Sequence, residues 1–326
     1  MEKFDELALE KTFIELLSKK GFKHLNGNTL SRSNDEIILE NELRKFLLKR
    51  YKSEELEDAE VGLIFNKLNN LSSSKLYESN KVFSEWLSDG FNFKRLDSKK
   101  KDIWINLIDF DDINLNDFKF VTQLTIMGSE NRRPDGIIFV NGLPIVVFEF
   151  KSAIRENATI FDAFVQINTR YIRDIPDLFK FNMFCVISDG INSKSGTCFA
   201  DYDYFYPWRR TLDNKNEMDG IDSMFSLIDG MFEKLSFIEI IKNFIYIPDK
   251  SSTEEKILCR YPQFYATRSI FESIKERQRP LGDGKGGTYF GSTGCGKSFI
   301  MLFLTRMLMK SEHFENPTVV LITDRT

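Results

Sequence analysis

The sequence has few of the residues on which many common chemistries depend. Its 326 residues include two histidines, His24 and His313, and four cysteines with no CxxC pair. We therefore expect neither a histidine-based active site nor a zinc site or disulfide framework. No apolar run approaches the ~20 residues that a membrane-spanning helix needs. The N-terminus lacks the apolar segment of a secretion signal, so we expect a cytoplasmic protein with no membrane partner.

The rest of the composition is that of a folded chain. Hydrophobic residues make up 42% and charged residues 29%, which excludes global disorder. The net charge of −4 excludes a uniformly basic nucleic-acid coat but not a local basic channel. Because histidine is scarce, we expect any catalysis to rely on carboxylates and lysines.

Hydrophobic periodicity divides the chain at a polar stretch, residues 248–256, and we assign domains to 1–250 and 251–326. In the first domain the pattern predicts helices, then a cluster of strands and then further helices. This order fits an α/β fold with a mixed central sheet flanked by helices. Helices are expected at 4–20, 41–51, 59–71, 80–88, 158–174 and 221–245, and strands within 118–151 and 183–190.

The second domain has the order strand, glycine-rich loop, helix and strand, which is typical of a parallel-sheet nucleotide domain. The sequence TYF precedes the loop, and TVVLIT follows the helix. The chain stops at Thr326, directly after that strand. Since no domain of this type is complete with two strands, we expect the chain to be the N-terminal part of a longer protein.

The glycine-rich loop matches the phosphate-binding pattern GxxxxGK[ST]. It runs from Gly291 through Gly294 and Gly296 to Lys297 and Ser298. Glycines let backbone N–H groups surround phosphate oxygens, the lysine neutralises the β- and γ-phosphates, and the hydroxyl ligates Mg²⁺. The flanking elements favour nucleotide binding over the alternative, a turn that only caps a helix. The motif alone does not choose between ATP and GTP.

A second motif lies in the strand cluster and has the outline PD, then ExK. Asp135 precedes the apolar segment GIIFVNGLPIVVF, and Glu149 and Lys151 follow it. Two carboxylates and a lysine on adjacent strands can hold divalent metal ions that activate water for attack at phosphorus. A charge in so apolar a strand is costly unless a cation accompanies it. These residues are therefore candidates for a metal-dependent site, with Lys151 orienting the nucleophile.

The register of this hairpin decides whether the site can exist. Asn141-Gly142 is a strong turn signal, but regular pairing around a two-residue loop would put Asp135 and Glu149 on opposite faces. A three-residue loop or a β-bulge would bring them to one face, so we predict such an irregularity. The alternative is an ordinary hairpin in which Glu149 pairs with Arg132 or Arg133.

The order and spacing of the motifs resemble the restriction (R, or HsdR) subunits of type I restriction–modification enzymes. The resemblance extends from about residue 80 to the end of the chain. It is carried by NRRPDGIIFVNGLPIVVFEFKSA, QINTRYIRDIPDLFKFN with VISDG, RYPQFYATRSIFESI, GGTYFGSTGCGKSFIMLFL and VVLITDRT. It implies a PD-(D/E)xK nuclease domain followed by the truncated start of a RecA-like motor domain of superfamily 2.

The resemblance also implies roles for individual residues. Asp135 and Glu149 would be ligands of Mg²⁺, and Lys151 the catalytic lysine. Glu10, on the first helix, corresponds to a further acidic active-site residue; the alternative is a solvated helix carboxylate. Gln263 resembles an adenine-reading glutamine, which would make ATP the nucleotide; the alternative is a surface glutamine.

A glutamine and a tyrosine follow the nuclease motif, but they are five residues apart, Gln166 and Tyr171, where the family pattern has four. On an α-helix that spacing separates the two side chains by about 140° and aligns Gln166 with Arg170 instead. We therefore predict that Gln166 contacts DNA or the active site, with a polar helix face as the alternative. Tyr171 is expected to serve packing.

The sequence thus predicts a restriction subunit: an ATP- and Mg²⁺-dependent endonuclease that cuts double-stranded DNA after translocation and works with methyltransferase and specificity subunits. By itself this chain should bind ATP poorly and not hydrolyse it, because further ATPase motifs would lie beyond Thr326. Two alternatives stay open: a P-loop motor with a non-catalytic N-terminal binding domain, and a DNA-repair nuclease–helicase.

Aromatic residues form rich patches at Trp104, Trp208 and residues 202–206. Stacking on single-stranded nucleic acid is one interpretation. We expect core packing instead, because most of the phenylalanines fall at helical or alternating positions.

Overall fold

The computed structural model describes residues 6–151, 159–211, 218–220, 222–249 and 253–322. The chain forms two compact units, Met1–Leu258 and Cys259–Thr326, referred to below as the first and second units. Within the described ranges, no helix is both long and apolar enough to cross a membrane.

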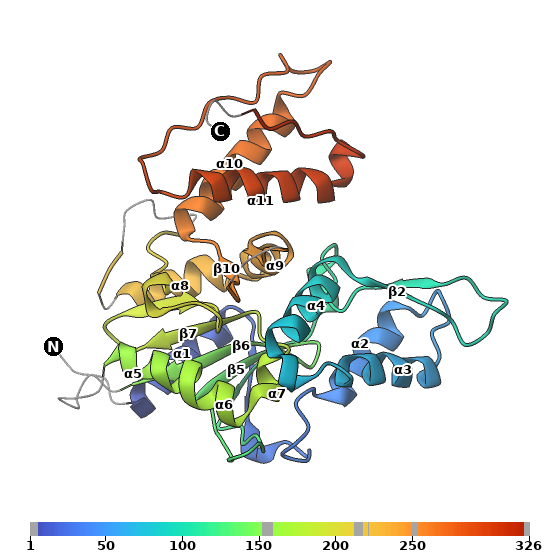
Figure 1. Ribbon diagram of the computed structural model, residues 1–326, viewed down its shortest axis with the longest axis vertical. Coiled ribbons are helices and arrows are strands. Elements are labelled where there is room, and N and C mark those ends of the chain that lie inside the picture. The colour runs from blue at the N-terminus through green and yellow to red at the C-terminus, as the bar shows by residue number, and fades with distance from the viewer. Residues whose placement is uncertain (1–5, 152–158, 212–217, 221, 250–252, 323–326) are drawn as a thin grey trace. The chain divides into compact units, whose positions relative to one another are not determined.

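A mixed sheet lies at the centre of the first unit, as predicted (Figure 1). Among the described residues its strand order is β1-β4-β5-β6-β7-β8, and the pairs β1–β4 and β6–β7 are parallel while the others are antiparallel. The strands are β1 (Lys23–Asn26), β4 (Phe118–Thr122), β5 (Gly136–Val140), β6 (Leu143–Phe150), β7 (Phe184–Ser188) and β8 (Ser193–Gly196). Two small antiparallel pairs are β2 (Phe91–Phe93) with β3 (Ile103–Ile105), and β9 (Ile245–Tyr246) with β10 (Ile257–Leu258).

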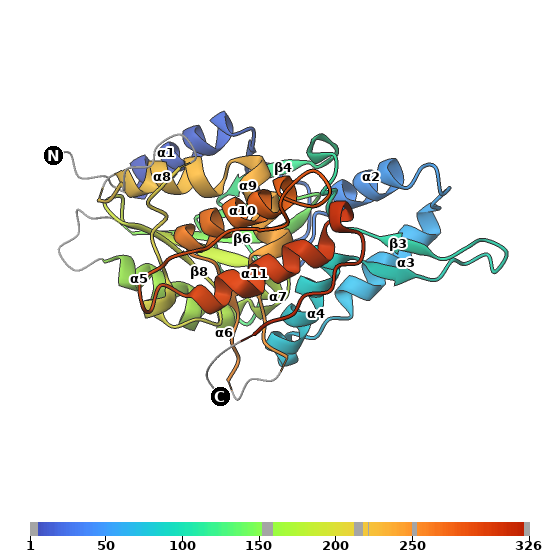
Figure 2. The same cartoon turned by 90° about the horizontal axis from the view of Figure 1, so that it is seen from above.

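Helices cover both faces of the sheet, so its inner strands are buried throughout and read as nearly continuous apolar runs. The helices are α1 (Glu6–Lys19), α2 (Glu40–Arg50), α3 (Asp58–Asn69), α4 (Leu76–Asp89), α5 (Ile160–Val165), α6 (Ile172–Asp174), α7 (Pro176–Phe179), α8 (Asp222–Met231) and α9 (Lys234–Asn243). Figure 2 shows the sheet between a layer containing α1 and α8 and a layer containing α5 and α6.

The two faces of the sheet differ in chemistry. On the α1 side, phenylalanine rings pack on one another; the Phe13 ring lies 4.6 Å from that of Phe150 and 5.8 Å from that of Phe148. On the α5 side, smaller aliphatic residues such as Val147 and Ile187 pack against the helices. Because side chains alternate along a strand, Glu149 shares this second face with Val147.

The β5–β6 hairpin contains both a tight turn and a bulge. Asn141 and Gly142 have φ values of 51° and 82°, the left-handed conformations of a two-residue type I′ turn. The register then shifts, because Phe139 pairs with Pro144 but Ile138 pairs with Val146. Proline has no N–H to donate, which explains why the extra residue is accommodated here.

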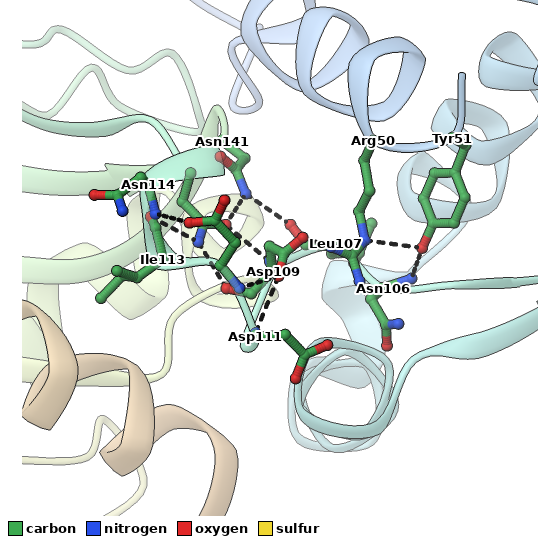
Figure 3. Close-up of polar contacts among 11 residues, drawn as sticks. Arg50, Tyr51, Asn106, Leu107, Asp109, Asp111, Ile113, Asn114 and Asn141 are labelled. Atoms are coloured by element: carbon green, nitrogen blue, oxygen red, sulfur yellow. Dashed lines mark hydrogen bonds and ion pairs between the residues drawn. The ribbon is translucent and has the colours of Figure 1, made fainter. Parts of the chain in front are cut away.

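Buried polar contacts hold this turn in place (Figure 3). The Asn141 amide donates to the carbonyl of Leu107, at 3.1 Å, and to Asn116 Oδ1, at 2.8 Å. Asn116 Oδ1 also accepts from the backbone N–H of Asp109, whose carboxylate pairs with Arg50. Since unsatisfied buried polar groups are costly, this network stabilises one register of the hairpin.

One expectation about the first unit was wrong. The helix expected over 221–245 is two helices, because Glu233 caps a new helix by accepting from the backbone N–H groups of Leu235 and Ser236. In the polar stretch at 248–256, Lys256 is 2% exposed, and the residues that follow it form β10.

The aromatic patches divide between core and surface. Trp208 and Phe205 are buried, as expected, whereas Trp104 is 56% exposed and Tyr204 is 61% exposed. Core packing therefore does not account for all of these rings.

The second unit contains α10 (Tyr261–Glu276) and α11 (Lys297–Lys310). The parallel strands expected at TYF and TVVLIT are absent from its described residues, and this expectation was wrong. Phe290 is 95% exposed and Ile322 88% exposed. A strand requires a hydrogen-bonded partner, and high strand propensity cannot replace one.

Candidate active site

The bulge brings the two predicted carboxylates to one face of the sheet. Because Gly136 pairs with Phe148, Asp135 lies opposite Glu149. We predicted that this arrangement would require an irregular hairpin. Asp135 Oδ2 accepts a hydrogen bond from the backbone N–H of Phe150 at 2.6 Å. This contact fixes the Asp135 carboxylate beside the end of β6.

Glu149 is the most enclosed member of the group, with 1% of its surface exposed. Its Oε1 lies 2.7 Å from Lys151 Nζ, and its Oε2 accepts from the hydroxyl of Tyr171 at 2.8 Å. The alternative pairing with an arginine is not observed: Arg132 pairs with Glu130 and Asp174. Glu149 is therefore held by a lysine and a tyrosine.

Burial and nearby negative charges raise the pKa values of both carboxylates. Desolvation, followed by the charge of Asp135, raises the pKa of Glu149 to about 8. Desolvation also raises the pKa of Asp135 to about 6, although the Phe150 N–H and the charge of Lys151 oppose this. One lysine thus offsets the two negative charges only in part, and a further cation would stabilise both.

The sequence spacing led us to expect Tyr171 to point away from Gln166 and to serve packing; Tyr171 is buried in the core, but the expected separation from Gln166 was wrong. Residues Gln166–Tyr171 form a π-helical turn, which accommodates one residue more than an α-helical turn. Gln166 Nε2 therefore reaches the Tyr171 hydroxyl at 2.8 Å. Arg170, expected to align with Gln166, is exposed. The five-residue spacing was itself the signal of an inserted residue.

Glu10 lies on α1 within electrostatic reach of the carboxylate pair, because its charge contributes to the raised pKa of Asp135. Its Oε2 accepts from Gln123 Nε2 at 2.6 Å. In the described part of the chain, no group of three or more His, Cys, Asp or Glu side chains is arranged to hold a metal. Asp135 and Glu149 are the two carboxylates that the bulged hairpin brings together.

The phosphate-loop residues belong to the second unit. Lys297 begins α11, and its Nζ donates to the carbonyls of Gly291 and Ser292, both at 2.9 Å. Gly296 has a φ of 83°, and a Cβ there would lie 2.2 Å from Gln263 Nε2. Gln263 is 3% exposed, so it is not the surface glutamine of the alternative reading. It lies against the loop and caps α10 by accepting from the Arg260 N–H at 2.8 Å.

Comparison with known proteins identifies the family. Residues 3–204 match the family described as the type I restriction enzyme R protein N terminus. The chain belongs to this family. Residues 262–326 match a second family, the SWI2/SNF2 ATPases.

Curated relatives agree with this assignment. The chain is 29% identical to the type I restriction enzyme HindI endonuclease subunit of Haemophilus influenzae, over 98% of this chain and 32% of that protein. A Methanocaldococcus jannaschii relative, named for the type I restriction enzyme MjaIXP endonuclease subunit, is also 29% identical, over 98% of this chain and 33% of its own length. The chain therefore spans about a third of the length of these relatives.

Proposed function

We propose that the first unit is the endonuclease domain of a type I restriction subunit and hydrolyses phosphodiesters of double-stranded DNA with Mg²⁺. The observation that carries this proposal is the bulged register, which puts Asp135, Glu149 and Lys151 on one face at the end of β6. An arrangement on opposite faces would have favoured a motor with a non-catalytic binding domain.

The carboxylate pair fits a divalent cation. Mg²⁺ prefers oxygen ligands, and Asp135 and Glu149 supply them with more negative charge than Lys151 balances. A bound Mg²⁺ would supply an activated water and charge stabilisation for in-line displacement at phosphorus.

The surrounding side chains have separate tasks in this proposal. The Tyr171 hydroxyl, which accepts a hydrogen bond from Gln166, fixes the Glu149 carboxylate, which would be a ligand of Mg²⁺. The Lys151 ammonium group would offset the negative charge that develops at the reacting phosphate. Glu10 is close enough for its charge to raise the pKa of Asp135, and it would add a third carboxylate to this acidic group.

The second unit supports a role for ATP. Gly291, Gly294, Gly296, Lys297 and Ser298 supply a phosphate loop at the start of α11, and Gln263 lies against it, where it could read adenine. Together with the SWI2/SNF2 match, this favours a subunit that couples cleavage to ATP-driven movement along DNA. Methyltransferase and specificity subunits are the partners expected from the family.

The test is restriction of phage by the intact protein in cells, comparing wild type with Lys151→Ala and Lys297→Ala. We expect both variants to lose restriction while host modification persists. Purified Lys151→Ala should also fail to cut plasmid DNA in Mg²⁺. The exposed Lys94 provides a matched control, since Lys94→Ala should cut normally. Normal cleavage by Lys151→Ala would show that the hairpin is not the active site.

A further inference from the structure

A cavity of about 360 Å³ lies at β8, two strands along the sheet from β6, and has no part in the function proposed above. Its walls include Lys194, Tyr202, Tyr206, Arg209 and Asp203. These residues come from β8, from the turn that contains Tyr202 and from the segment that follows it. The cavity thus combines aromatic rings with charged groups of both signs.

One residue that lines the cavity, Ser193, lies at the end of the sheet where β6 finishes before Lys151. The backbone N–H of Lys151 donates to the carbonyl of Ser188 at 2.9 Å, and the Ser188 hydroxyl lies 2.8 Å from that of Ser193. Ser193 begins β8 and lines the cavity. Two inter-strand spacings, roughly 10 Å, separate β6 from β8. This is the length of about three stacked nucleotides of a DNA strand.

The ring of Tyr202 is held in a fixed orientation. It meets the rings of Phe161 and Phe164 edge-on, with centroids 5.1 and 5.5 Å away. Lys194 Nζ lies 4.4 Å from the centre of the same ring and 3.2 Å from its hydroxyl. Phe161 is 47% exposed and lies on α5, so aromatic surface continues from this wall toward the helix that carries Gln166. A base that stacks on this face of Tyr202 would take the place of the Lys194 ammonium group, and aromatic rings are typical stacking surfaces for bases.

The polar lining suits a nucleobase better than a phosphate. Arg209 Nε is buried and has no hydrogen-bond partner among the described residues, while its Nη2 pairs with Asp219 at 2.9 Å. Asp203 and Asp219 bring carboxylates to the same wall. Carboxylates repel a phosphate but accept hydrogen bonds from base amino groups, and Arg or Lys donates to base acceptors.

We propose that this cavity receives an unpaired base of the DNA strand that lies across the active site, with Tyr202 as its stacking surface and Arg209 as its hydrogen-bond donor. The inference rests on the nuclease function proposed above. A base inside a duplex cannot enter such a cavity, so occupancy requires that the base leaves the stack. The cavity would then hold one strand in position relative to Lys151.

The test measures binding of fluorescein-labelled single strands to the intact protein carrying Lys151→Ala, with Ca²⁺ present to prevent cleavage. One probe carries normal bases, and the other has abasic sites with the same phosphates. We expect about ten-fold tighter binding of the base-bearing probe. Tyr202→Ala should abolish this preference, whereas Tyr202→Phe should keep it. Tyr204→Ala is the matched control, because Tyr204 is in the same turn but does not line the cavity.

Several results would overturn the proposal. These are equal binding of both probes by the Lys151→Ala protein, a base preference that survives Tyr202→Ala, and displacement of the probe by free mononucleotides at matching affinity. Should Tyr202→Ala fail to fold, oligonucleotides containing 5-iodouracil can be crosslinked to the protein with native Tyr202. Crosslinks should then map to Tyr202 or Tyr206, and crosslinks found only elsewhere would refute the site.

The experiments distinguish an error in the proposed nuclease function from an error in this inference. If Lys151→Ala still cuts plasmid DNA, the proposed active site is wrong, whatever the base preference. If Lys151→Ala is inactive but shows no base preference, the active site stands and the cavity has no role in holding a base.

Discussion

The two motifs of this chain are built in different ways. The nuclease motif depends on residues far apart in the sequence, since Glu149 is held by Tyr171 and faces Asp135 across a bulged pair of strands. The phosphate loop depends on neighbours, since Lys297 donates to carbonyls five and six residues before it. The loop therefore forms even though the strands expected on either side of it do not.

Burial separates the two regions in the same way. Glu149 is enclosed within a sheet covered on both faces, whereas Lys297 and Ser298 are exposed at the start of α11. A site made inside a core carries an electrostatic cost that only a bound cation relieves. A site made from backbone N–H groups at a helix end carries little of that cost, because water still reaches it. The predictions below test this contrast, from the largest expected effect to the smallest.

Glu149→Gln should stabilise the protein when metal is removed by a chelator. Burial raises the pKa of Glu149 from 4.5 to about 8, so its contribution to stability is full at low pH and is lost as pH rises through about 8. Near pH ~8, we expect the variant to gain on the order of a few kcal/mol in the free energy of unfolding, with no gain near pH ~4. Urea unfolding at the two pH values measures this.

Adding Mg²⁺ gives a second test of the Glu149→Gln variant. Mg²⁺ should raise the melting temperature of the wild type and not that of Glu149→Gln, since only a folded protein with both carboxylates binds it well. Glu130→Gln, at an exposed glutamate, is the matched control and should behave as wild type. Equal stability of wild type and Glu149→Gln at alkaline pH would show that Glu149 carries no such cost.

Tyr171→Phe should lower DNA cleavage about 10- to 100-fold, because it removes a hydrogen bond to a buried charge, worth about 1.5–3 kcal/mol. It should also move the pH dependence of the rate upward, since Tyr171 lowers the pKa of Glu149. Steady-state cleavage rates across pH measure both effects. Tyr77→Phe, which loses a hydroxyl bonded to the carbonyl of Glu255, should leave the rate unchanged.

Lys256→Met should remove a pH dependence that lies away from the active site. Lys256 is buried among Asn80, Ser84 and the carbonyl of Asn182, no carboxylate of the described residues pairs with it, and burial lowers its pKa from 10.5 to about 8. The unfolded chain therefore binds a proton between these values that the folded chain lacks. This contribution to stability rises with pH, by about 1–3 kcal/mol.

The difference in unfolding free energy between wild type and Lys256→Met, followed by urea titration between pH ~7.5 and ~10, isolates that contribution. The control Lys20→Met, at a lysine paired with Asp229 near the surface, should parallel the wild type across the range. A constant difference between wild type and Lys256→Met would mean that burial does not shift the titration of this lysine.

Among these variants, Gly296→Ala should have the smallest effect on the stability of the protein. Its φ of 83° and the 2.2 Å approach of Gln263 Nε2 leave no room for a Cβ, so we expect about 1 kcal/mol of local destabilisation. Hydrogen exchange should quicken in α10 and α11 and stay unchanged in β6. Gly294→Ala, at a similar φ but with open space around it, should do less. Faster exchange in β6 would show that the two units are energetically coupled.

The sequence by itself determined the features that depend on neighbouring residues. The first helices were predicted within a few residues of their observed ends, because apolar side chains repeat at helical spacing. The Asn141-Gly142 turn and the phosphate loop followed from the left-handed conformations that such residues favour. The need for a bulge followed from the alternation of side chains along a strand, because regular pairing around a two-residue turn would put the two carboxylates on opposite faces.

The tertiary structure decided what depends on distant residues. It located the bulge at Pro144, which lacks an N–H, and formed the π-helical turn that brings Tyr171 to Glu149. It also buried Lys256, which lies in a polar stretch of the sequence. Contacts of this kind form between segments that have no local pattern in common. For that reason the sequence could name the carboxylates and the lysine of the candidate site but could not show that Tyr171 contacts Glu149.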